Sequence, residues 1–356
     1  MIDWVTAKMP CRNTLQTGCV AKLDKEGNVE WLSQSWLPVV GTYEATIQIK
    51  PISENMIEVS GNPAKWLQGH NLFGTNDLQY LMSEFYSWLF EAMCEDGINP
   101  TLEQIDMVEK GFYTVSRVDI NETWHLANQS EVKAWIRSAG DKVSLARRGR
   151  GVFSGDTLYW GKLKKYNYWF LKCYSKGDEI NAKKSNYPQE LRTPEMLEYA
   201  DKALRLELTL ASKALREWGL NMPCNWLPNQ AKSLLLDHIK KLEMNNNFKL
   251  DDKLLDSLPR RLRTYYKLWL HGEDLRQEMT KPTFYRVRRE LKEYDIDIAL
   301  VRDVEKPVEV VPLIKILEAQ PVGIPYWAFE QGLVVCPDHE NPLKQSEDIS
   351  PVACPA

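Results

Sequence analysis

The sequence predicts an α+β domain with an antiparallel sheet, followed by a mainly helical domain. Alternating polar and apolar residues over 41–50, 56–60 and 112–120 are typical of half-buried strands. Between them, apolar residues recur every three or four positions over 77–94, which indicates an amphipathic helix. After about residue 229 the strand pattern gives way to helices with short breaks. The order of these patterns is the basis of the predicted fold class.

Domain boundaries follow from this change of pattern. The 356 residues are enough for about two domains, each with its own core. We predict the α+β domain at 1–225 and the helical domain at 226–332. The remaining segment, 333–356, is rich in Pro, Asp, Glu and Ser, so we expect it to be disordered.

Four further elements are expected before the boundary. Residues 157–161 and 168–174 resemble two strands on either side of a Lys-rich turn, and 130–137 resemble a helix. Residues 203–210 are ambiguous, because their Leu and Glu residues suit helices as well as strands. We favour a strand there.

Composition excludes several classes of protein. The chain is 44% hydrophobic, has a formal net charge of −4 and contains no apolar run near the roughly 18 residues that span a membrane. Its seven cysteines form no C-x-x-C pair, its histidines form neither H-x-H nor H-E-x-x-H, and G-x-x-x-x-G-K-[ST] is absent. A disulfide miniprotein, a zinc enzyme and a P-loop ATPase are therefore excluded. We expect a protein of the cytoplasm with no membrane partner.

The net charge conceals two basic segments. Residues 133–176 contain eleven Lys and Arg against Asp141 and Asp156, a local charge of +9. Residues 260–295 contain ten basic residues against six acidic ones, a local charge of +4. Basic segments in an acidic chain predict a polyanionic partner such as DNA.

Three carboxylates stand inside apolar, strand-like stretches: Glu58, Asp119 and Glu207. A buried carboxylate is costly alone, so each must face solvent, pair with a cation or bind a metal. In Arg117-x-Asp119 and Arg205-x-Glu207 the strand period puts both side chains on one face, and an intrastrand ion pair is one interpretation. The other interpretation is that the three carboxylates converge on one sheet. This arrangement predicts a site for Mg²⁺ or Mn²⁺, because hard cations prefer oxygen ligands.

Tyr174, in the stretch CYSKGDE, is the candidate nucleophile. If its strand continues, Lys176 shares its face and Glu179 follows after a turn at a glycine. A tyrosine hydroxyl is a poor nucleophile at neutral pH, but an adjacent lysine and a metal-bound phosphate would stabilise the developing phenolate. The alternative is an ordinary strand tyrosine. Its position at the end of the +9 segment favours the functional interpretation.

Residues 258–272, 273–279 and 282–294 predict three helices with the spacing of a helix-turn-helix. Packing of helices with a solvated basic face is the alternative. In the first interpretation the third helix enters a DNA groove. Its candidate contacts are Thr283, Tyr285, Arg286, Arg288 and Arg289.

Several stretches of the sequence resemble motifs of the replication initiators of filamentous bacteriophages. These stretches occur in that family's order and span most of the chain from residue 56 to about 330. They are NPAKWLQGHNLFGTNDL at 62–78, SRVDI at 116–120, CYSKGDE at 173–179, LRLELTLASKALREWG at 204–219 and VEVVPLIKILEAQ at 308–320. More distantly, the chain resembles plasmid rolling-circle initiators, whose motifs E-x-S-G, R-x-D and Y-x-K-x-x-E match Glu58 to Gly61, Arg117 and Asp119, and Tyr174, Lys176 and Glu179.

The resemblance implies a site-specific endonuclease that nicks one strand of origin DNA and starts rolling-circle replication. Tyr174 and Lys176 match its catalytic positions, and Glu58 and Asp119 match acidic positions that hold a metal. Most rolling-circle nucleases use a His-hydrophobe-His pair as metal ligands, which this chain lacks. We take Glu207 as the third ligand, with Glu179 or His70 as alternatives.

These observations together predict a metal-dependent nickase that forms a 5'-phosphotyrosine and later rejoins the strand. Expected partners are supercoiled origin DNA, single-stranded viral DNA, the host helicase and polymerase, and further copies of the chain on DNA, in the cytoplasm of a bacterial host. The second cleavage would use Tyr166, Tyr168 or a second protomer. The competing functions are a non-enzymatic DNA-binding regulator and a metal-free tyrosine recombinase or type IB topoisomerase. The predicted DNA contacts are Arg147, Arg148, Arg150, Lys164, Lys165, Lys281, Arg286, Arg288 and Arg289.

Overall fold

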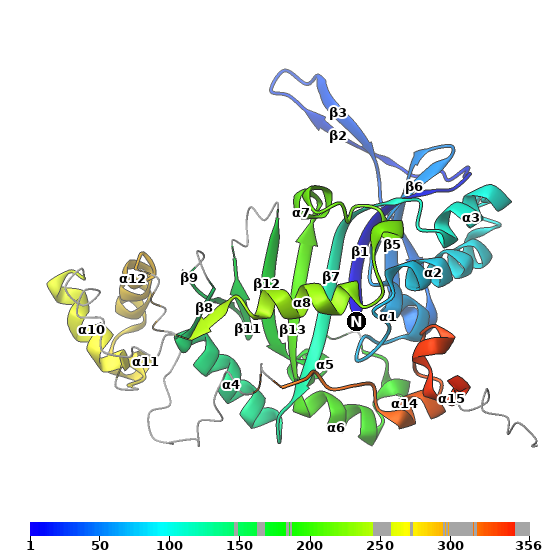
Figure 1. Ribbon diagram of the computed structural model, residues 1–356. Helices are drawn as coiled ribbons and strands as arrows, with labels where there is room; N and C mark the ends of the chain where they lie inside the picture. The colour runs from blue at the N-terminus through cyan, green and yellow to red at the C-terminus, as the bar shows by residue number, and fades with distance from the viewer. Residues whose placement is uncertain are drawn as a thin grey trace, which may run out of the picture. The chain divides into compact units, whose positions relative to one another are not determined.

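The computed structural model divides the chain into two compact units (Figure 1). One unit comprises Met1–Glu243 together with Leu317–Ala356, and the other is Met244–Ile316. The described residues are 1–145, 149–161, 168–182, 185, 187–244, 258–270, 273–294, 296, 298, 316 and 319–345.

A nine-stranded sheet organises the first unit, in the order β10-β11-β12-β13-β7-β1-β6-β5-β4. Every pair of neighbouring strands is antiparallel, which confirms the predicted α+β class. The strands are β1 (Ile2–Pro10), β4 (Leu37–Val40), β5 (Thr46–Ser53), β6 (Met56–Gly61), β7 (Thr114–His125), β10 (Val152–Ser154), β11 (Thr157–Trp160), β12 (Trp169–Ser175) and β13 (Ala203–Ala211).

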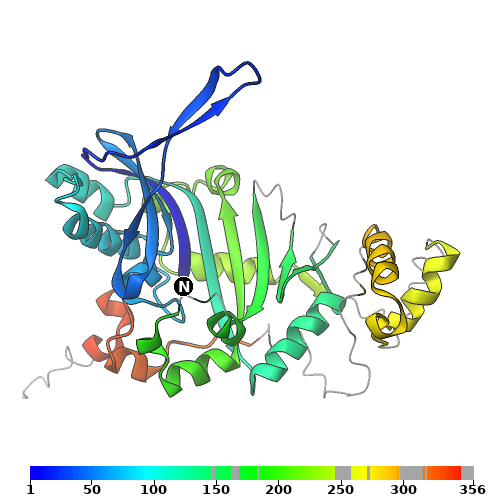
Figure 2. The ribbon, with the colours of Figure 1, turned by 180° about the vertical axis from the view of Figure 1, so that it is seen from behind.

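One face of this sheet is apolar and the other is polar, as the alternation of each strand dictates. Leu206, Leu208 and Leu210 of β13 are fully buried on the apolar face. Helices α2 and α8 lie across this face (Figure 1), and Trp169 packs its ring 4.4 Å from that of His238 on α8. From behind, no helix crosses the middle of the polar face (Figure 2).

The helices of the first unit begin and end at recognisable caps. Asp77 caps α2 by accepting a hydrogen bond from the Tyr80 N–H at 2.9 Å, and Thr101 and Gln104 form a capping box on α3. The helices are α1 (Pro63–Gln68), α2 (Leu78–Met93), α3 (Leu102–Glu109), α4 (Gln129–Lys142), α5 (Lys176–Asn181), α6 (Pro194–Lys202), α7 (Ser212–Glu217), α8 (Gln230–Ile239), α14 (Tyr326–Glu330) and α15 (Pro342–Gln345).

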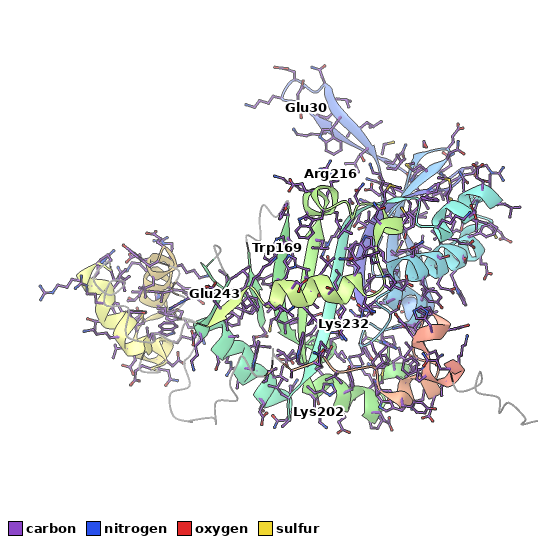
Figure 3. All side chains as sticks on the ribbon, in the orientation of Figure 1. Glu30, Trp169, Lys202, Arg216, Lys232 and Glu243 are labelled. Carbon is purple, nitrogen blue, oxygen red and sulfur yellow. The ribbon has the colours of Figure 1, made fainter. Side chains whose placement is uncertain are left out.

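Two smaller sheets complete this unit. The hairpin of β2 (Cys19–Leu23) and β3 (Val29–Gln34) projects away from the main sheet, with Glu30 exposed on it (Figure 3). The other sheet joins β14 (Leu242–Met244), β8 (Val143–Leu145) and β9 (Gly149–Arg150). None of the helices in the described ranges is long and apolar enough to cross a membrane.

The second unit is built on three helices, α10 (Arg260–Leu270), α11 (Leu275–Glu278) and α12 (Lys281–Lys292). Their positions agree with the three helices that the sequence predicts. A common core joins them, because each helix turns its apolar side inward. Its buried members are Leu258, Leu262, Tyr266, Leu275, Phe284, Val287, Leu291, Ile296 and Ile298.

The predicted domain boundaries differ from these units. Helix α8, expected in the helical domain, packs on the sheet of the first unit. Residues 319–345 also return to the first unit. They comprise 319–332, expected in the helical domain, and 333–345 of the tail that was expected to be disordered. Polar composition misled the prediction, since apolar side chains of this segment, such as Ala328 and Leu333, pack in the core of the first unit. Backbone hydrogen bonds, such as Val322 N–H to Thr123 O at 2.8 Å, add to this packing.

Candidate active site

Tyr174 lies on the polar face of the sheet, where β12 pairs with β13. The strand register places Tyr174 opposite Arg205 and Lys172 opposite Glu207. The Tyr174 hydroxyl donates a hydrogen bond of 3.2 Å to Glu207 Oε2, and Lys172 Nζ lies 2.8 Å from Glu207 Oε1. Lys172 Nζ also lies 5.5 Å from the centre of the Tyr174 ring. The phenol, the carboxylate and the ammonium group therefore form one group of contacting side chains.

Burial around these three side chains favours protonated oxygens, whereas Lys172 favours the ionised carboxylate. Burial, together with the charges of Asp119 and Asp3, raises the pKa of Glu207 to about 8, and Lys172 opposes the shift. Burial also raises the pKa of Tyr174, with Glu179 and Glu207 acting in the same direction. Tyr174 is thus a neutral phenol at neutral pH. Its hydrogen-bond acceptor is Glu207, which takes the Tyr174 proton in its ionised form, the form that Lys172 stabilises.

Lys176 does not lie beside Tyr174 as the continued strand would require. Strand β12 ends at Ser175, whose hydroxyl caps α5 by accepting from the Asp178 N–H at 3.2 Å, so Lys176 is the first helical residue. Its Nζ is buried and bonds Asn71 Oδ1 at 2.7 Å and Glu179 Oε2 at 2.9 Å. Lys176, the expected catalytic lysine, therefore already binds two other polar side chains. The lysine that lies over the Tyr174 ring is Lys172.

The three predicted metal ligands do not converge. Glu58 lies opposite Lys8 of β1 and forms an ion pair with Lys50 of β5 at 2.9 Å. Asp119 lies four or five residues away along β1, roughly 13–17 Å at about 3.3 Å per residue, and Arg117 binds it through two hydrogen bonds of 2.6 and 2.9 Å. The intrastrand ion pair considered from the sequence is therefore present at Arg117 and Asp119.

The chemistry of these donors does not fit the predicted magnesium site. Each carboxylate already has its own cation, at Lys50, Arg117 and Lys172. Across the described ranges, no group of three or more His, Cys, Asp or Glu residues is arranged to hold a metal ion. We therefore derive no catalytic step through a metal.

Asp3 is a site residue that the sequence analysis missed. The register of β1 with β7 runs from Ile2 opposite Ile120 to Val5 opposite Val118, so Asp3 and Trp4 together face the single residue Asp119. Such a bulge re-aims side chains and is frequent beside active sites. The Asp3 carboxylate acts electrostatically on Glu207. No periodicity in the sequence shows a bulge, because it depends on the neighbouring strand.

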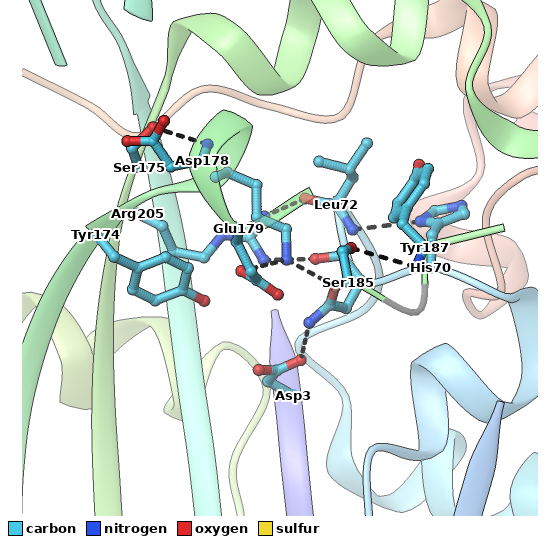
Figure 4. Close-up of polar contacts among 12 residues, drawn as sticks. Asp3, His70, Leu72, Tyr174, Ser175, Asp178, Glu179, Ser185, Tyr187 and Arg205 are labelled. Atoms are coloured by element: carbon cyan, nitrogen blue, oxygen red, sulfur yellow. Dashed lines mark hydrogen bonds and ion pairs between the residues drawn. The ribbon is translucent and has the colours of Figure 1, made fainter. Parts of the chain in front are cut away.

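Asp3 also begins a buried polar network at the edge of the site (Figure 4). Its carboxylate accepts from Asn71 Nδ2 at 2.9 Å, and Asn71 in turn accepts from Lys176. Arg205, also fully buried, donates to the backbone oxygens of Asn71 and Leu72 rather than to Glu207. The network therefore fixes the 71–72 loop against β13 and β1.

His70, an alternative metal ligand in the sequence analysis, uses both of its ring nitrogens in hydrogen bonds within the protein. Its Nδ1 accepts from the Leu72 N–H at 3.3 Å, and its Nε2 lies 2.9 Å from Leu333 O. A proton on Nε2 satisfies both contacts, so the ring is neutral. Burial lowers the pKa of His70 to about 3. His70 anchors the returning segment 319–345 to the loop that carries Asn71.

The candidates for a second cleavage are not beside Tyr174. Tyr168 packs on Trp218 with ring centres 5.5 Å apart, and six residues of extended strand separate it from Tyr174, about 20 Å. Tyr166 lies outside the described residues. The alternative, that a second protomer makes the second cleavage, stays a prediction.

The predicted DNA contacts fall in several environments. Arg150 of β9 is exposed, and Lys281, Arg286 and Arg289 are exposed on α12, whereas Arg288 is half-buried. Tyr285, 63% exposed, lies on the same side of α12 as Lys281 and Arg289, four residues from each. The remaining candidates lie outside the described residues: Arg147, Arg148, Lys164 and Lys165.

Comparisons with known proteins identify the family of this chain. Residues 1–229 match the family model for the N-terminal part of the gene-two replication-associated protein, and residues 251–334 match the model for its C-terminal part. The replication-associated protein of this name from Enterobacteria phage I2-2 is 36% identical over 334 residues, covering 91% of this chain and 95% of that protein.

More distant relatives carry the same description. The protein of Salmonella phage IKe is 25% identical over 320 residues, covering 74% of this chain and 72% of its own. That of Enterobacteria phage M13 is 26% identical over 182 residues, covering 46% of this chain and 42% of its own. No solved structure matches the chain. Both halves of the sequence match one description, and the chain therefore belongs to the gene-two replication-associated protein family of filamentous phages.

Proposed function

We propose that this member of the family is a site-specific DNA nicking and joining enzyme that initiates rolling-circle replication. The observation that carries the proposal is the contact of the Tyr174 hydroxyl with Glu207, which Lys172 also binds. A nucleophile within hydrogen-bond reach of a basic group is the arrangement that covalent catalysis requires. It lies on an antiparallel sheet in a protein of a phage replication family.

The chemistry follows from these three side chains. Tyr174 Oη attacks the scissile phosphorus while its proton passes to Glu207, and the bond from phosphorus to the 3'-oxygen breaks. The 3'-oxygen leaves and takes a proton from water, and the hydroxide that results removes from Glu207 the proton that Tyr174 gave up. The products are a 5'-phosphotyrosine and a free 3'-hydroxyl that primes a host polymerase. Attack by a 3'-hydroxyl on the phosphotyrosine reverses the step and joins a strand without ATP.

Recognition of the origin is assigned in this proposal to the second unit. Helix α12 carries Lys281, Arg286 and Arg289 on exposed positions, and a helix of this kind fits the major groove while its cations neutralise phosphates. Melting of the duplex costs free energy at each stacked step, so negatively supercoiled DNA is the expected substrate. The host helicase and polymerase would act on the opened product in the host cytoplasm.

The test is a nicking assay on supercoiled plasmid DNA that carries the origin region of the phage genome encoding this chain. With Mg²⁺ present, the unmodified protein should convert the plasmid to nicked circles and remain attached to the 5' end on a denaturing gel. Tyr174→Phe should form no adduct, while the control Tyr168→Phe should behave as the unmodified protein. An adduct formed by Tyr174→Phe would refute Tyr174 as nucleophile.

The same assay decides two open predictions. Loss of nicking in EDTA and recovery with Mg²⁺ or Mn²⁺ would support metal dependence, and full nicking in EDTA would contradict it. Binding to origin DNA without nicking in any of these conditions would favour the DNA-binding regulator, which the exposed basic face of α12 also supports.

A further inference from the structure

Three aromatic rings on the polar face of the main sheet each carry a cation, and each cation is held by a carboxylate. Lys50 Nζ lies 4.4 Å from the centre of the Trp36 ring and pairs with Glu58. The Arg117 guanidinium lies 5.2 Å from the Trp4 ring and pairs with Asp119. The third set is Tyr174 with Lys172 and Glu207. The predicted metal ligands thus serve three separate ring–cation–carboxylate sets.

The hydrogen bonds and register place the three sets on one face. Trp4 Nε1 donates to Ser60 Oγ at 3.3 Å, and Ser60 lies two residues from Glu58 on β6, so both point to the same side. Arg117 is opposite Thr6, whose hydroxyl bonds the same Ser60 at 2.8 Å. The sets therefore form a row from β12 to the segment before β4.

This row is open to solvent. Trp36 is 41% exposed, Trp4 and Tyr174 are half-buried, and no helix crosses the middle of this face (Figure 2). The opposite face already supplies the apolar core of the sheet. The Trp36 ring and the accessible part of Trp4 are therefore available to a ligand on this face.

We propose that these three sets, the aromatic track, bind the single DNA strand that leads into Tyr174, with bases stacked on Trp4 and Trp36. The inference rests on the proposed nicking function and names the path of its substrate. Aromatic stacking with nearby cations is the general mode of single-strand binding, because every base has a face to stack and every nucleotide a phosphate. From β12 to β5 there are five strand spacings, about 24 Å at ~4.8 Å each, enough for several nucleotides.

The carboxylates give the track its selectivity for a single strand. Glu58, Asp119 and Glu207 partly neutralise the cations that stand over the rings, which weakens attraction for phosphate alone. A duplex, whose bases are already stacked inside, gains only that weakened attraction. A single strand gains the stacking contacts as well.

The experiment measures binding of a fluorescent dodecathymidylate to the full chain carrying Tyr174→Phe, so that no cleavage occurs. In this background Trp36→Leu and Trp4→Leu should each weaken binding about 5- to 100-fold, the range for loss of one stacked base. The matched control is Trp88→Leu on α2, where the ring is 52% exposed on an element that covers the opposite face. It should bind as the parent does.

Both track variants are first checked for the thermal unfolding midpoint of the parent. If Trp4→Leu fails that check, the surface variant Trp36→Leu carries the test alone. Unchanged binding of dodecathymidylate by folded Trp36→Leu would overturn the aromatic track, as would equal weakening by Trp88→Leu. A chain that binds through these rings yet nicks no origin DNA would refute the proposed function and leave the track standing.

Discussion

The two basic segments, 133–176 and 260–295, carry similar numbers of basic residues on different kinds of secondary structure. In the first, Lys172 and Lys176 are held on or beside the central sheet, each against a carboxylate. In the second, Lys281 and Arg289 are exposed on one helix. Charge summed along the chain predicts a phosphate-binding surface for both segments. The sum does not distinguish cations that are paired on or beside the sheet from cations that are exposed, such as Arg150 in the first segment and Lys281 in the second.

The cause of the difference is the secondary structure that carries each cation. A central strand has a neighbour on each side, and a carboxylate on that neighbour lies about 5 Å away. Lys172 meets Glu207 in this way across β12 and β13. A surface helix has only its own turns beside it, so its outer side chains stay exposed. In this chain, basic residues of the sheet therefore organise the site, and those of α12 are available to DNA.

The largest expected effect concerns the carboxylate that receives the tyrosine proton. Glu207→Gln should lower the rate of nicking by about 10²- to 10⁴-fold, because an amide cannot accept that proton. Binding of origin DNA should change little. Rates on supercoiled DNA and gel-shift affinities measure the two quantities. Exposed Glu217, changed to Gln, is the control. A Glu207→Gln enzyme with an undiminished rate would rule out Glu207 as the base.

The next effect is on stability and compares a lysine from each segment. Lys172→Met leaves Glu207, which is 1% exposed, without its cation, and should lower the free energy of unfolding by about 3–5 kcal/mol. Lys281→Met removes an exposed charge and should change it by less than about 0.5 kcal/mol. Urea unfolding measures both. Equal values would show that the two environments do not differ energetically.

A pH effect is expected from a third buried basic group, His70. Its folded pKa of about 3 lies below the unfolded value of 6.5, so between these values the unfolded chain binds the proton and the folded chain does not. Stability should therefore be complete above pH 6.5 and fall by about 2 kcal/mol between pH 6.5 and 5. His70→Asn should flatten this slope, whereas the same change at exposed His339 should leave it. Identical slopes in both variants would contradict the assignment.

The smallest effect tests the exposed face of α12. Arg289→Ala should weaken binding of origin DNA by about tenfold and reduce the slope of log affinity against log salt by about one, as expected for one lost phosphate contact. Lys110→Ala, which removes an exposed lysine of the first unit, is the control. If Arg289→Ala keeps the parental salt slope, α12 does not contact phosphate at this position.

The local elements were predictable because their signals are periodic. The period of two identified β6, β7 and β12, and the 3- to 4-residue period identified α2 and the three helices of the second unit. The ambiguous stretch 203–210 is strand β13, as favoured. The period also made an intrastrand pair possible at Arg117 and Asp119, where it is present, and at Arg205 and Glu207, where Arg205 instead binds backbone oxygens.

The errors arose where a distant part of the chain decides the outcome. Lys176 left the face of Tyr174 because Ser175 starts a helix there, and the sequence motif is equally consistent with a continuing strand. Glu58 was grouped with Asp119 because both are strand carboxylates, but the register places them far apart along β1. The folded part of the tail was missed because its partners, such as His70, lie more than 260 residues away.

The sequence by itself determined the α+β class, the three-helix unit, the basic segments and Tyr174 as the candidate nucleophile, because each depends on neighbouring residues or on a short motif. Only the tertiary structure decided which group accepts the Tyr174 hydrogen bond, where Asp3 lies and which cation each carboxylate holds. These depend on strand order, register and the bulge at Asp3 and Trp4. A shift of one residue in register would turn each side chain to the other face of the sheet, and no local pattern in the sequence encodes it.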